Sequence, residues 1–343
     1  MFSMIYCIIN TIMKKLMPIT ENIKKPLISF LIISTLIFLF ALQVVFPVKA
    51  NEVNSKKTAV AEKPRILVIG EVNLFPKKQY FKMKPIADYV AWNMKDLGIT
   101  GADILIAKSN EQMVQYLKEG KVDWLSETIF SSLVLEKKAG AEIILRRWKK
   151  NVPEYHTLFF VRKDSGITSL KDLRGKIIAL EEPSSTTACF VPSIELLKKD
   201  LKIQQLESTS GKPFPDRVGY VFARKEINIS SWVYKDLTDA GAFSNLDWNN
   251  ERKMPLAFKK DLKIIYRSNP IPRAAVLVRK DLSPVMKSRL KKILLNMHKD
   301  PKAVKILQAY QGTKKFDAMD EKTNAVFIEM RSFLNTFSTE TGR

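Results

Sequence analysis

Short apolar runs alternate with amphipathic segments over most of the chain, and this alternation limits the fold more than any other feature. Arg65–Gly70 (RILVIG) and Asp103–Ala107 (DILIA) are continuous apolar runs of the kind found in fully buried strands. Between them, Pro85–Leu97 has helical periodicity and is followed by Gly98, a common helix stop. Because parallel strands are joined by crossover helices, the pattern predicts an α/β fold with a mainly parallel sheet.

The alternation falls into blocks that suggest two lobes. Residues 51–63 are polar and lack periodicity, so we expect them to form a linker. We predict that residues 64–162 form the first part of lobe 1, that 163–268 form lobe 2, and that 269–343 return to lobe 1 and end in helices. Two α/β lobes joined by two extended crossings make a hinged clamshell, whose ligand lies in the cleft between the lobes.

The first 50 residues have the character of an export segment. Residues 26–46 carry no charge, lysines precede them, and a small-x-small sequence ends at Ala50. This pattern is typical of a cleaved signal peptide, but the run also approaches the roughly 20 residues that span a bilayer. Residues 1–50 are therefore either a signal peptide or an N-terminal anchor that contacts the inner membrane through residues 26–46. Both interpretations place the rest of the chain in the periplasm.

The composition argues against several kinds of chemistry. Two cysteines and two distant histidines provide neither a disulfide framework nor a His/Cys zinc site. The twelve glycines form neither a G-x-G-x-x-G motif nor a P-loop, and no nucleophile–base arrangement is evident. We therefore expect no metal, no cofactor and no catalytic residues, and we do not expect an enzyme.

The net charge of +22 suggests an anionic partner. The first 50 residues hold five lysines and one glutamate, which leaves +18 for the exported part. The excess is also explained by lysines that solvate helix surfaces, and export argues against a nucleic-acid partner. One local basic cluster either steers anions or, in the interpretation we favour, is an exposed strand end: Arg146, Arg147, Lys149 and Lys150.

A run of four hydroxyl residues is the most informative local feature. It follows the expected buried strand Lys176–Leu180 and opens an amphipathic helix: Ser184, Ser185, Thr186 and Thr187. The first N–H groups of a helix lack partners within the helix, and the helix dipole places partial positive charge there. Hydroxyls beside these groups suit the oxygens of a phosphate-like anion. One hydroxyl is enough for an N-cap, so the run indicates an anion site, with simple capping as the alternative.

Four stretches, in order along the chain, resemble the PhnD-like phosphate- and phosphonate-binding periplasmic solute-binding proteins of ABC transporters. They are LKEGKVDWLSETIF, SLKDLRGKIIALEEPSSTTACFVP, TDAGAFSN and IPRAAVLVRKDLSPVMKSRLKKILLNM. The resemblance covers most of residues 65–320. It implies a type II periplasmic-binding-protein clamshell with two hinge crossings, a small phosphorus oxyanion as ligand (phosphonate, phosphate or phosphite) and an ABC permease as partner. A membrane-anchored ligand-sensing module and an enzyme on the same fold stay open as alternatives.

The resemblance also implies a set of ligand-binding residues. Ser185, Thr186 and Thr187 match the triplet that binds phosphoryl oxygens in this family. Asp239 matches the acidic residue of the second-lobe strand, which faces the ammonium group of amine-bearing ligands. Tyr80 matches an aromatic residue of the first lobe that closes over the ligand.

The sequence departs from the family pattern at three places. It has no histidine between His156 and His298, where relatives often hold the phosphoryl group with a Ser-His pair, and Ala188 replaces a glycine. Glu127 stands where small residues are common. In the cleft, Glu127 would accept a hydrogen bond from a protonated oxyanion or pair with an amine, and would repel a fully ionised phosphate. Outside the cleft, it would be a solvated carboxylate at a helix start.

Overall fold

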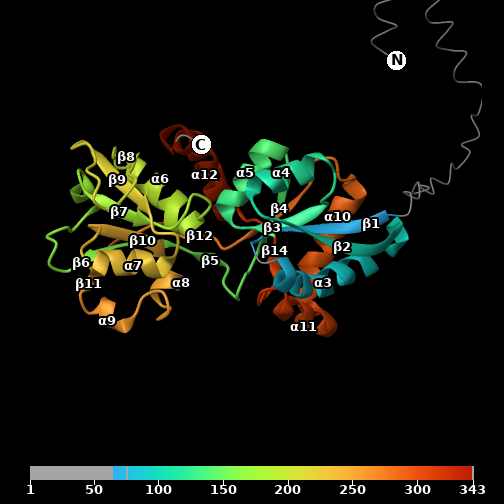
Figure 1. The fold of residues 1–343 in the computed structure, drawn as a ribbon. Coiled ribbons are helices and arrows are strands. Elements are labelled where there is room, and N and C mark those ends of the chain that lie inside the picture. Colours follow the sequence, from blue (N-terminus) through green and yellow to red (C-terminus); the bar gives the residue numbers. More distant parts are fainter. Residues whose placement is uncertain (1–64, 75, 342–343) are drawn as a thin grey trace, which may run out of the picture. The chain divides into compact units, whose positions relative to one another are not determined.

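The computed structural model describes residues 65–74 and 76–341. The expected export segment and linker, residues 1–63, lie outside this range. Within the described residues, two mixed six-stranded sheets form the cores of two lobes (Figure 1). No helix in the described part of the chain is both long and apolar enough to cross a membrane.

The sheet of lobe 1 has the order β14-β4-β13-β3-β1-β2. Its strands are β1 (Arg65–Val72), β2 (Ile99–Ala107), β3 (Trp124–Glu127), β4 (Glu142–Arg147), β13 (Ala275–Val278) and β14 (Phe316–Asp317). Its helices are α3 (Pro76–Trp92), α4 (Asn110–Lys118), α5 (Ile129–Ala139), α10 (Pro284–Asn296) and α11 (Pro301–Ala309). β1 pairs in parallel with β2 and β3, whereas β13 is antiparallel to β3 and β4.

Local sequence explains how β1 and its neighbours pack. Gly70 faces Met113 of α4 and Val122, which precedes β3. An added Cβ would lie 3.0 Å from Met113 and 2.7 Å from Val122, so only glycine fits without a shift. Ser109 caps α4 by accepting a hydrogen bond from the Gln112 N–H at 3.3 Å. These contacts fix the position of the α4 N-terminus at the carboxyl end of β2.

The first helix differs from the sequence expectation. It begins at Pro76 rather than Pro85, so Pro85 lies inside α3, where it has no N–H to donate. The helix ends at Trp92, and a 3-10 turn (η2, Lys95–Leu97) leads to Gly98 in a left-handed conformation with φ of 80°. Proline is commonest in the first turn of a helix, which is why the sequence pattern placed the start too late.

The sheet of lobe 2 has the order β11-β6-β10-β7-β9-β8. Its strands are β6 (Thr157–Arg162), β7 (Ile177–Leu180), β8 (Lys202–Gln205), β9 (Arg217–Phe222), β10 (Ala240–Ser244) and β11 (Leu262–Arg267). The short 3-10 turn η3 (Leu170–Leu173) precedes β7. The helices are the π-helical turn η4 (Thr186–Phe190), which continues into α6 (Val191–Leu197), followed by α7 (Glu226–Tyr234), α8 (Asn245–Trp248) and α9 (Leu256–Lys259).

Both sheets are mixed rather than mainly parallel. In lobe 2, β7 to β10 run parallel, but β6 and β11 are antiparallel to their neighbours. β6 carries residues 157–162, which the sequence analysis assigned to lobe 1, yet it pairs with β10 and β11 in the second sheet. Strands that enter a lobe from the hinge run opposite to the strands of its βαβ units, and an apolar run alone does not reveal which sheet it joins.

A two-stranded ribbon connects the lobes. β5 (Glu154–Tyr155) and β12 (Ile271–Pro272) pair antiparallel, so the two crossings of the chain are hydrogen-bonded to each other. The 3-10 turn η5 (Met297–Lys299) lies between α10 and α11. The last helix, α12 (Glu321–Thr341), follows β14.

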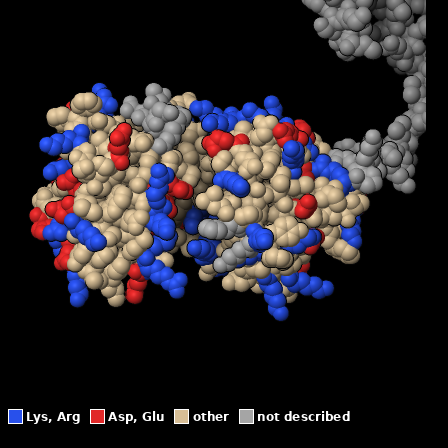
Figure 2. All heavy atoms as spheres, viewed as in Figure 1, with Lys and Arg blue, Asp and Glu red and all other residues tan. Residues whose placement is uncertain are grey.

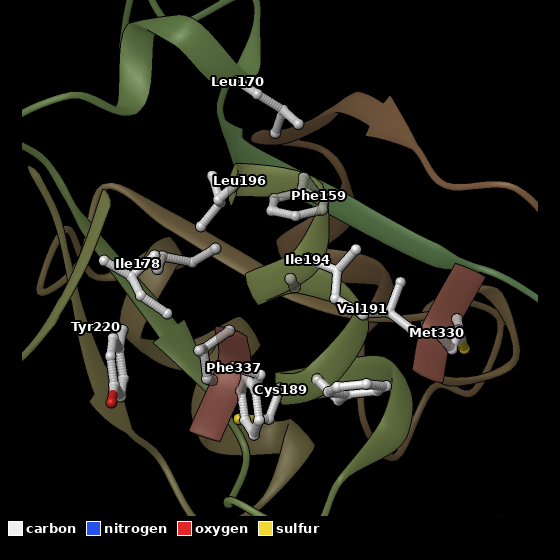
Figure 3. Packing of buried hydrophobic residues seen from close by; sticks show 14 of the residues in the cluster. Phe159, Leu170, Ile178, Cys189, Val191, Ile194, Leu196, Tyr220, Met330 and Phe337 are labelled. Atoms are coloured by element: carbon white, nitrogen blue, oxygen red, sulfur yellow. The ribbon is translucent and has the colours of Figure 1, made fainter. Parts of the chain in front are cut away.

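α12 packs against lobe 2 as well as lobe 1. Met330 and Phe337 belong to the hydrophobic cluster that contains Phe159, Ile194 and Cys189 of lobe 2 (Figure 3). On the other side, Arg331 donates to Glu136 of α5 in lobe 1 at 2.6 and 2.9 Å. The C-terminal helix therefore bridges the two lobes.

Candidate functional site

A cleft of about 1470 Å³ is lined by residues of both lobes and of the hinge. Figure 2 shows the hollow between the lobes, with Lys and Arg atoms visible within it. Glu71 lies near the carboxyl end of β1, Glu127 is the last residue of β3, and Glu182 follows β7. All three glutamates line the cleft. The site thus lies where ligands bind in open α/β sheets, beyond the carboxyl ends of the strands.

Three helix N-termini face this cleft. The first turns of α4 (Ser109–Glu111) and α5 (Thr128–Ser131) line it from lobe 1. Pro183 and Ser184, which precede the η4–α6 helix, line it from lobe 2. Because each N-terminus presents N–H groups and partial positive charge, their convergence favours an anion.

Two buried carboxylates form part of the cleft floor. Glu71 is 5% exposed and accepts hydrogen bonds from Gln79 Nε2 at 2.7 Å and from Gln311 Nε2 at 2.8 Å. Glu127 is 8% exposed, and its Oε1 accepts a hydrogen bond from the Val72 N–H at 2.8 Å. Burial and the nearby Glu71 carboxylate raise the pKa of Glu127 above its ordinary value.

Arg147 and Lys149 lie near the Glu127 carboxylate, and Arg273 lies near Lys149. Lys149 and Arg273 line the cleft. Arg147, 1% exposed, stacks on the Tyr310 ring at 4.5 Å and donates from Nη2 to Gln311 Oε1 at 2.9 Å. Burial, together with repulsion from Arg147, lowers the pKa of the Lys149 ammonium. Arg147 is therefore not part of an exposed strand end, as the sequence suggested, but belongs to the interior beneath the cleft.

Further lysines give the cleft an excess of positive charge. Two additional carboxylates, Glu111 and Glu182, line it, against a larger set of basic residues: Lys82, Lys108, Lys137, Lys138, Lys150 and Lys314. The lining as a whole thus attracts anions and raises their local concentration.

Most side chains of the hydroxyl run make contacts within the protein and do not line the cleft. Ser185 caps η4 by accepting from the Ala188 N–H at 3.3 Å, as the capping alternative predicted. Thr186 is buried, and its Oγ1 accepts a hydrogen bond from the Phe130 N–H at the start of α5, across the lobes, at 3.1 Å. Thr187 is also buried, and its carbonyl accepts from the Thr157 hydroxyl at 2.8 Å. Of the four residues, Ser184 lines the cleft directly.

Glu127 lines the cleft, but two further residues expected there, in addition to the hydroxyl triplet, do not. Tyr80 packs half-buried against the core of lobe 1, and its neighbour Gln79 lines the cleft instead. Asp239 immediately precedes β10 and accepts a hydrogen bond from the Ile177 N–H at 2.8 Å, at the start of β7. Because β7 and β10 are parallel, Asp239 lies at the edge of the sheet opposite the cleft.

Several cleft residues were missed by sequence reasoning. Glu71 had a usable signal, because it directly follows the apolar run RILVIG just as Glu127 follows Trp124–Ser126. Carboxyl ends of parallel strands meet at one edge of a sheet, so this signal could have indicated that the two glutamates are neighbours. Gln311 and Arg273 come from loops near residue 310 and from the hinge, where no periodic pattern marks an inward side chain.

We expect Thr186→Ala to lower the free energy of unfolding by about 1–3 kcal/mol, because the partly buried Phe130 N–H loses its acceptor. If the hydroxyl triplet also holds phosphoryl oxygens, affinity for methylphosphonate or phosphate falls as well. Chemical denaturation and calorimetric titration measure the two effects. Ser184→Ala, at an exposed position, is the control, and equal stabilities of the two variants would refute the interlobe role of Thr186.

Comparison with known proteins identifies the family. A family model described as "ABC transporter, phosphonate, periplasmic substrate-binding protein" matches residues 75–323. The chain belongs to this family. The phosphonates-binding periplasmic protein of Escherichia coli (strain K12) is 25% identical over 248 residues, which cover 69% of this chain and 70% of that protein.

Solved structures agree with the family. XAC2383 from Xanthomonas citri, bound to chloride ion, is 36% identical, has a TM-score of 0.74 and covers 80% of this chain and 99% of its own. The same protein has also been solved bound to ATP. PhnD1 from Prochlorococcus marinus, in complex with methylphosphonate, is 17% identical with a TM-score of 0.54 over 80% of this chain and 99% of its own, a likeness of fold. The expected type II clamshell and the family resemblance are thereby confirmed.

Family membership establishes the general role. This member of the phosphonate-binding family is the periplasmic substrate-binding component of an ABC transporter, takes a small ligand and works with a permease. The possible membrane contact through residues 26–46 falls outside the described residues.

Proposed function

We propose that this protein captures a small phosphorus oxyanion (phosphonate, phosphate or phosphite) in its interlobe cleft and delivers it to the permease without covalent chemistry. The observation that carries the proposal is the convergence of three helix N-termini on a cleft whose lining has more basic than acidic side chains. Preorganised N–H groups and cations replace the water around an anion with little rearrangement.

Closure of the hinge explains how the anion is held. The paired crossings β5 and β12 let the lobes approach as units, and the Thr186–Phe130 hydrogen bond already links helix starts from opposite lobes. An anion bound at the α5 N-terminus would interact with both lobes at once, which stabilises the closed arrangement over the open one.

A nucleotide is the second candidate ligand, and two observations favour it. The cleft, at about 1470 Å³, is larger than a single phosphonate requires, and lysines line it from several elements, including Lys108, Lys138 and Lys314. XAC2383, the relative at 36% identity, has been solved with ATP bound. Several phosphoryl groups would neutralise more of these lysines than one phosphonate does.

Thermal unfolding of residues 51–343 with different anions tests the proposal. The panel contains phosphate, phosphite, methylphosphonate, 2-aminoethylphosphonate, sulfate and ATP at constant ionic strength. A ligand at 100 times its Kd stabilises the folded protein by about 2.7 kcal/mol, which visibly raises the unfolding midpoint. We expect a rise with at least one phosphorus oxyanion; a rise with ATP alone selects the second candidate, and no rise with any anion rejects both.

Two further measurements address the alternatives. A receptor returns its bound anion unchanged, whereas an enzyme on the same fold would convert it, so phosphorus NMR of the recovered ligand separates the two. N-terminal sequencing of the exported protein distinguishes the signal peptide from the anchored sensor, since a start at Asn51 is incompatible with an anchor formed by residues 26–46.

A further inference from the structure

Arg273 occupies the hinge and faces the cleft. It lies between β12 and β13, and its backbone N–H donates to the Pro153 carbonyl at 2.8 Å, next to the other crossing. Its guanidinium lies over the ring of Tyr155 in β5, with 4.5 Å between the guanidinium carbon and the ring centroid. The two crossings together therefore hold the side chain in position at the wall of the cleft.

The Arg273 guanidinium lacks the carboxylate partners that Arg146 and Arg279 have. Arg146 pairs with Asp317 and Glu154, and Arg279 pairs with Asp123. Among the described residues, the buried Nε of Arg273 has no hydrogen-bond acceptor, and no carboxylate forms an ion pair with its guanidinium. A partly buried cation without a counter-charge is costly, so an anion from solution is the natural partner.

The surrounding charges leave a surplus for such an anion. Arg147, Lys149 and Arg273 contribute three potential positive charges against the two carboxylates Glu71 and Glu127. Arg273 is close enough to Lys149 to help lower the pKa of its ammonium. An anion placed between these two side chains would relieve their mutual repulsion.

Arg273 also lies close to the hydroxyl run of lobe 2. Burial raises the pKa of the Tyr155 phenol, while Arg273 and the side chains of Thr186 and Thr187 oppose the rise. Tyr155 thus interacts both with the arginine and with the two threonines. Through Tyr155, Arg273 is linked to the segment that joins lobe 2 to the start of α5.

We propose that Arg273 is the principal fixed positive charge of the ligand site and binds the oxyanion through its guanidinium N–H groups, with Lys149 as the second cation. This inference rests on the proposed function and adds the residue that replaces the histidine absent from lobe 2. A guanidinium suits phosphoryl oxygens because its planar donors bind two oxygens at once and it keeps its charge at any physiological pH.

The test compares Arg273→Gln, Arg273→Lys and the control Arg267→Gln in the complete exported chain. Arg267 ends β11 on the same crossing, is exposed and does not line the cleft. Calorimetric titration with phosphate, methylphosphonate and ATP at constant ionic strength measures affinity. For each anion that binds the unaltered protein, we expect a loss of roughly 10- to 150-fold for Arg273→Gln, the equivalent of removing one or two hydrogen bonds to a charged group.

The other variants separate binding from structure. Arg273→Lys keeps the charge but loses the planar donors, and we expect about a tenfold loss; Arg267→Gln should stay within about threefold. Without ligand, Arg273→Gln should unfold at the same temperature or higher, because an unpaired buried charge has been removed. A lower midpoint with unchanged affinity would make Arg273 a structural residue and overturn the inference.

The remaining outcomes are equally decisive. Equal losses of affinity in Arg273→Gln and Arg267→Gln would show that Arg273 attracts the anion only over long range. This result would overturn the inference and leave the proposed function intact. If Arg273→Gln does not fold, unchanged affinity in Arg273→Lys overturns it. If none of the three anions binds the unaltered protein, this inference fails; the proposed function fails with it when phosphite and 2-aminoethylphosphonate also leave the unfolding midpoint unchanged.

Discussion

Glu127→Gln is expected to flatten the pH dependence of oxyanion binding. In the unaltered protein, burial and Glu71 raise the pKa of Glu127, so its carboxyl is largely neutral at low pH and becomes anionic as the pH rises through the raised pKa. Burial and Arg147 lower the pKa of Lys149, which therefore loses its charge as the pH rises through the lowered pKa. Both changes make the cleft less positive at higher pH, so anion affinity falls.

The expected effect is large because each proton taken up on binding changes affinity about tenfold per pH unit. Between about pH 6 and pH 9, we expect the affinity for methylphosphonate to fall more steeply in the unaltered protein than in Glu127→Gln. The ratio of the two affinities should therefore change by about tenfold or more between the two ends of this range. The ratio of the two affinities at each pH cancels the titration of the ligand itself. Calorimetric titration across this range gives that ratio.

Glu111→Gln is the matched control. Glu111 is an exposed carboxylate at the start of α4 that also lines the cleft, and hydrogen bonds from its own backbone N–H and from Ser109 lower its pKa. It stays ionised throughout the range, so its removal should change affinity by a constant factor. A constant ratio for Glu127→Gln too would mean that Glu127 does not titrate near the bound anion.

Phe337→Ala is expected to lower the free energy of unfolding by about 3–5 kcal/mol, the usual loss for a fully buried phenylalanine. Phe337 of α12 is 1% exposed, and its ring centroid lies 5.2 Å from that of Phe190 in lobe 2 and 5.6 Å from that of Phe130 in lobe 1. The truncation leaves a cavity where three elements meet. Urea denaturation followed by circular dichroism measures the loss.

Ile328→Ala tests whether the effect is specific to the buried face of α12. Ile328 is on the same helix but is 66% exposed, so its removal should change stability by less than about 0.5 kcal/mol. Similar small losses for both variants would show that α12 contributes little to the joint between the lobes.

The sequence predicted the fold better than the placement of single strands and helices. Alternating apolar runs and four family-like stretches led to the two-lobed clamshell, because hydrophobic periodicity reports burial directly. The same apolar character does not say which sheet a strand joins, and residues 157–162 were therefore assigned to the wrong side of the hinge. The bridging position of α12 depends on contacts with β8 and α6, which are far away in sequence.

Strand ends in the sequence indicate which side chains lie at the cleft, whereas the direction of a side chain on a helix or in a loop could not be predicted. Glu127 lies in the cleft because it ends a buried strand. Tyr80 differs from the lining residue Gln79 by one position, which on a helix turns a side chain by about 100°. Asp239 precedes β10, so it lies at the amino end of the parallel strands, whereas the cleft lies at their carboxyl ends. Arg273 occupies an aperiodic hinge, where sequence alone carries no directional signal.

The bridging position of α12 bears on how such proteins can be recombined. A segment limited to residues 157–267 contains every strand of the second sheet, yet Met330, Leu334 and Phe337 complete its hydrophobic core from the far end of the chain. Lobe 2 is therefore not an exchangeable module. A chimaera that grafts it onto another scaffold must carry residues 321–341 along, or leave an apolar surface uncovered and prone to aggregation.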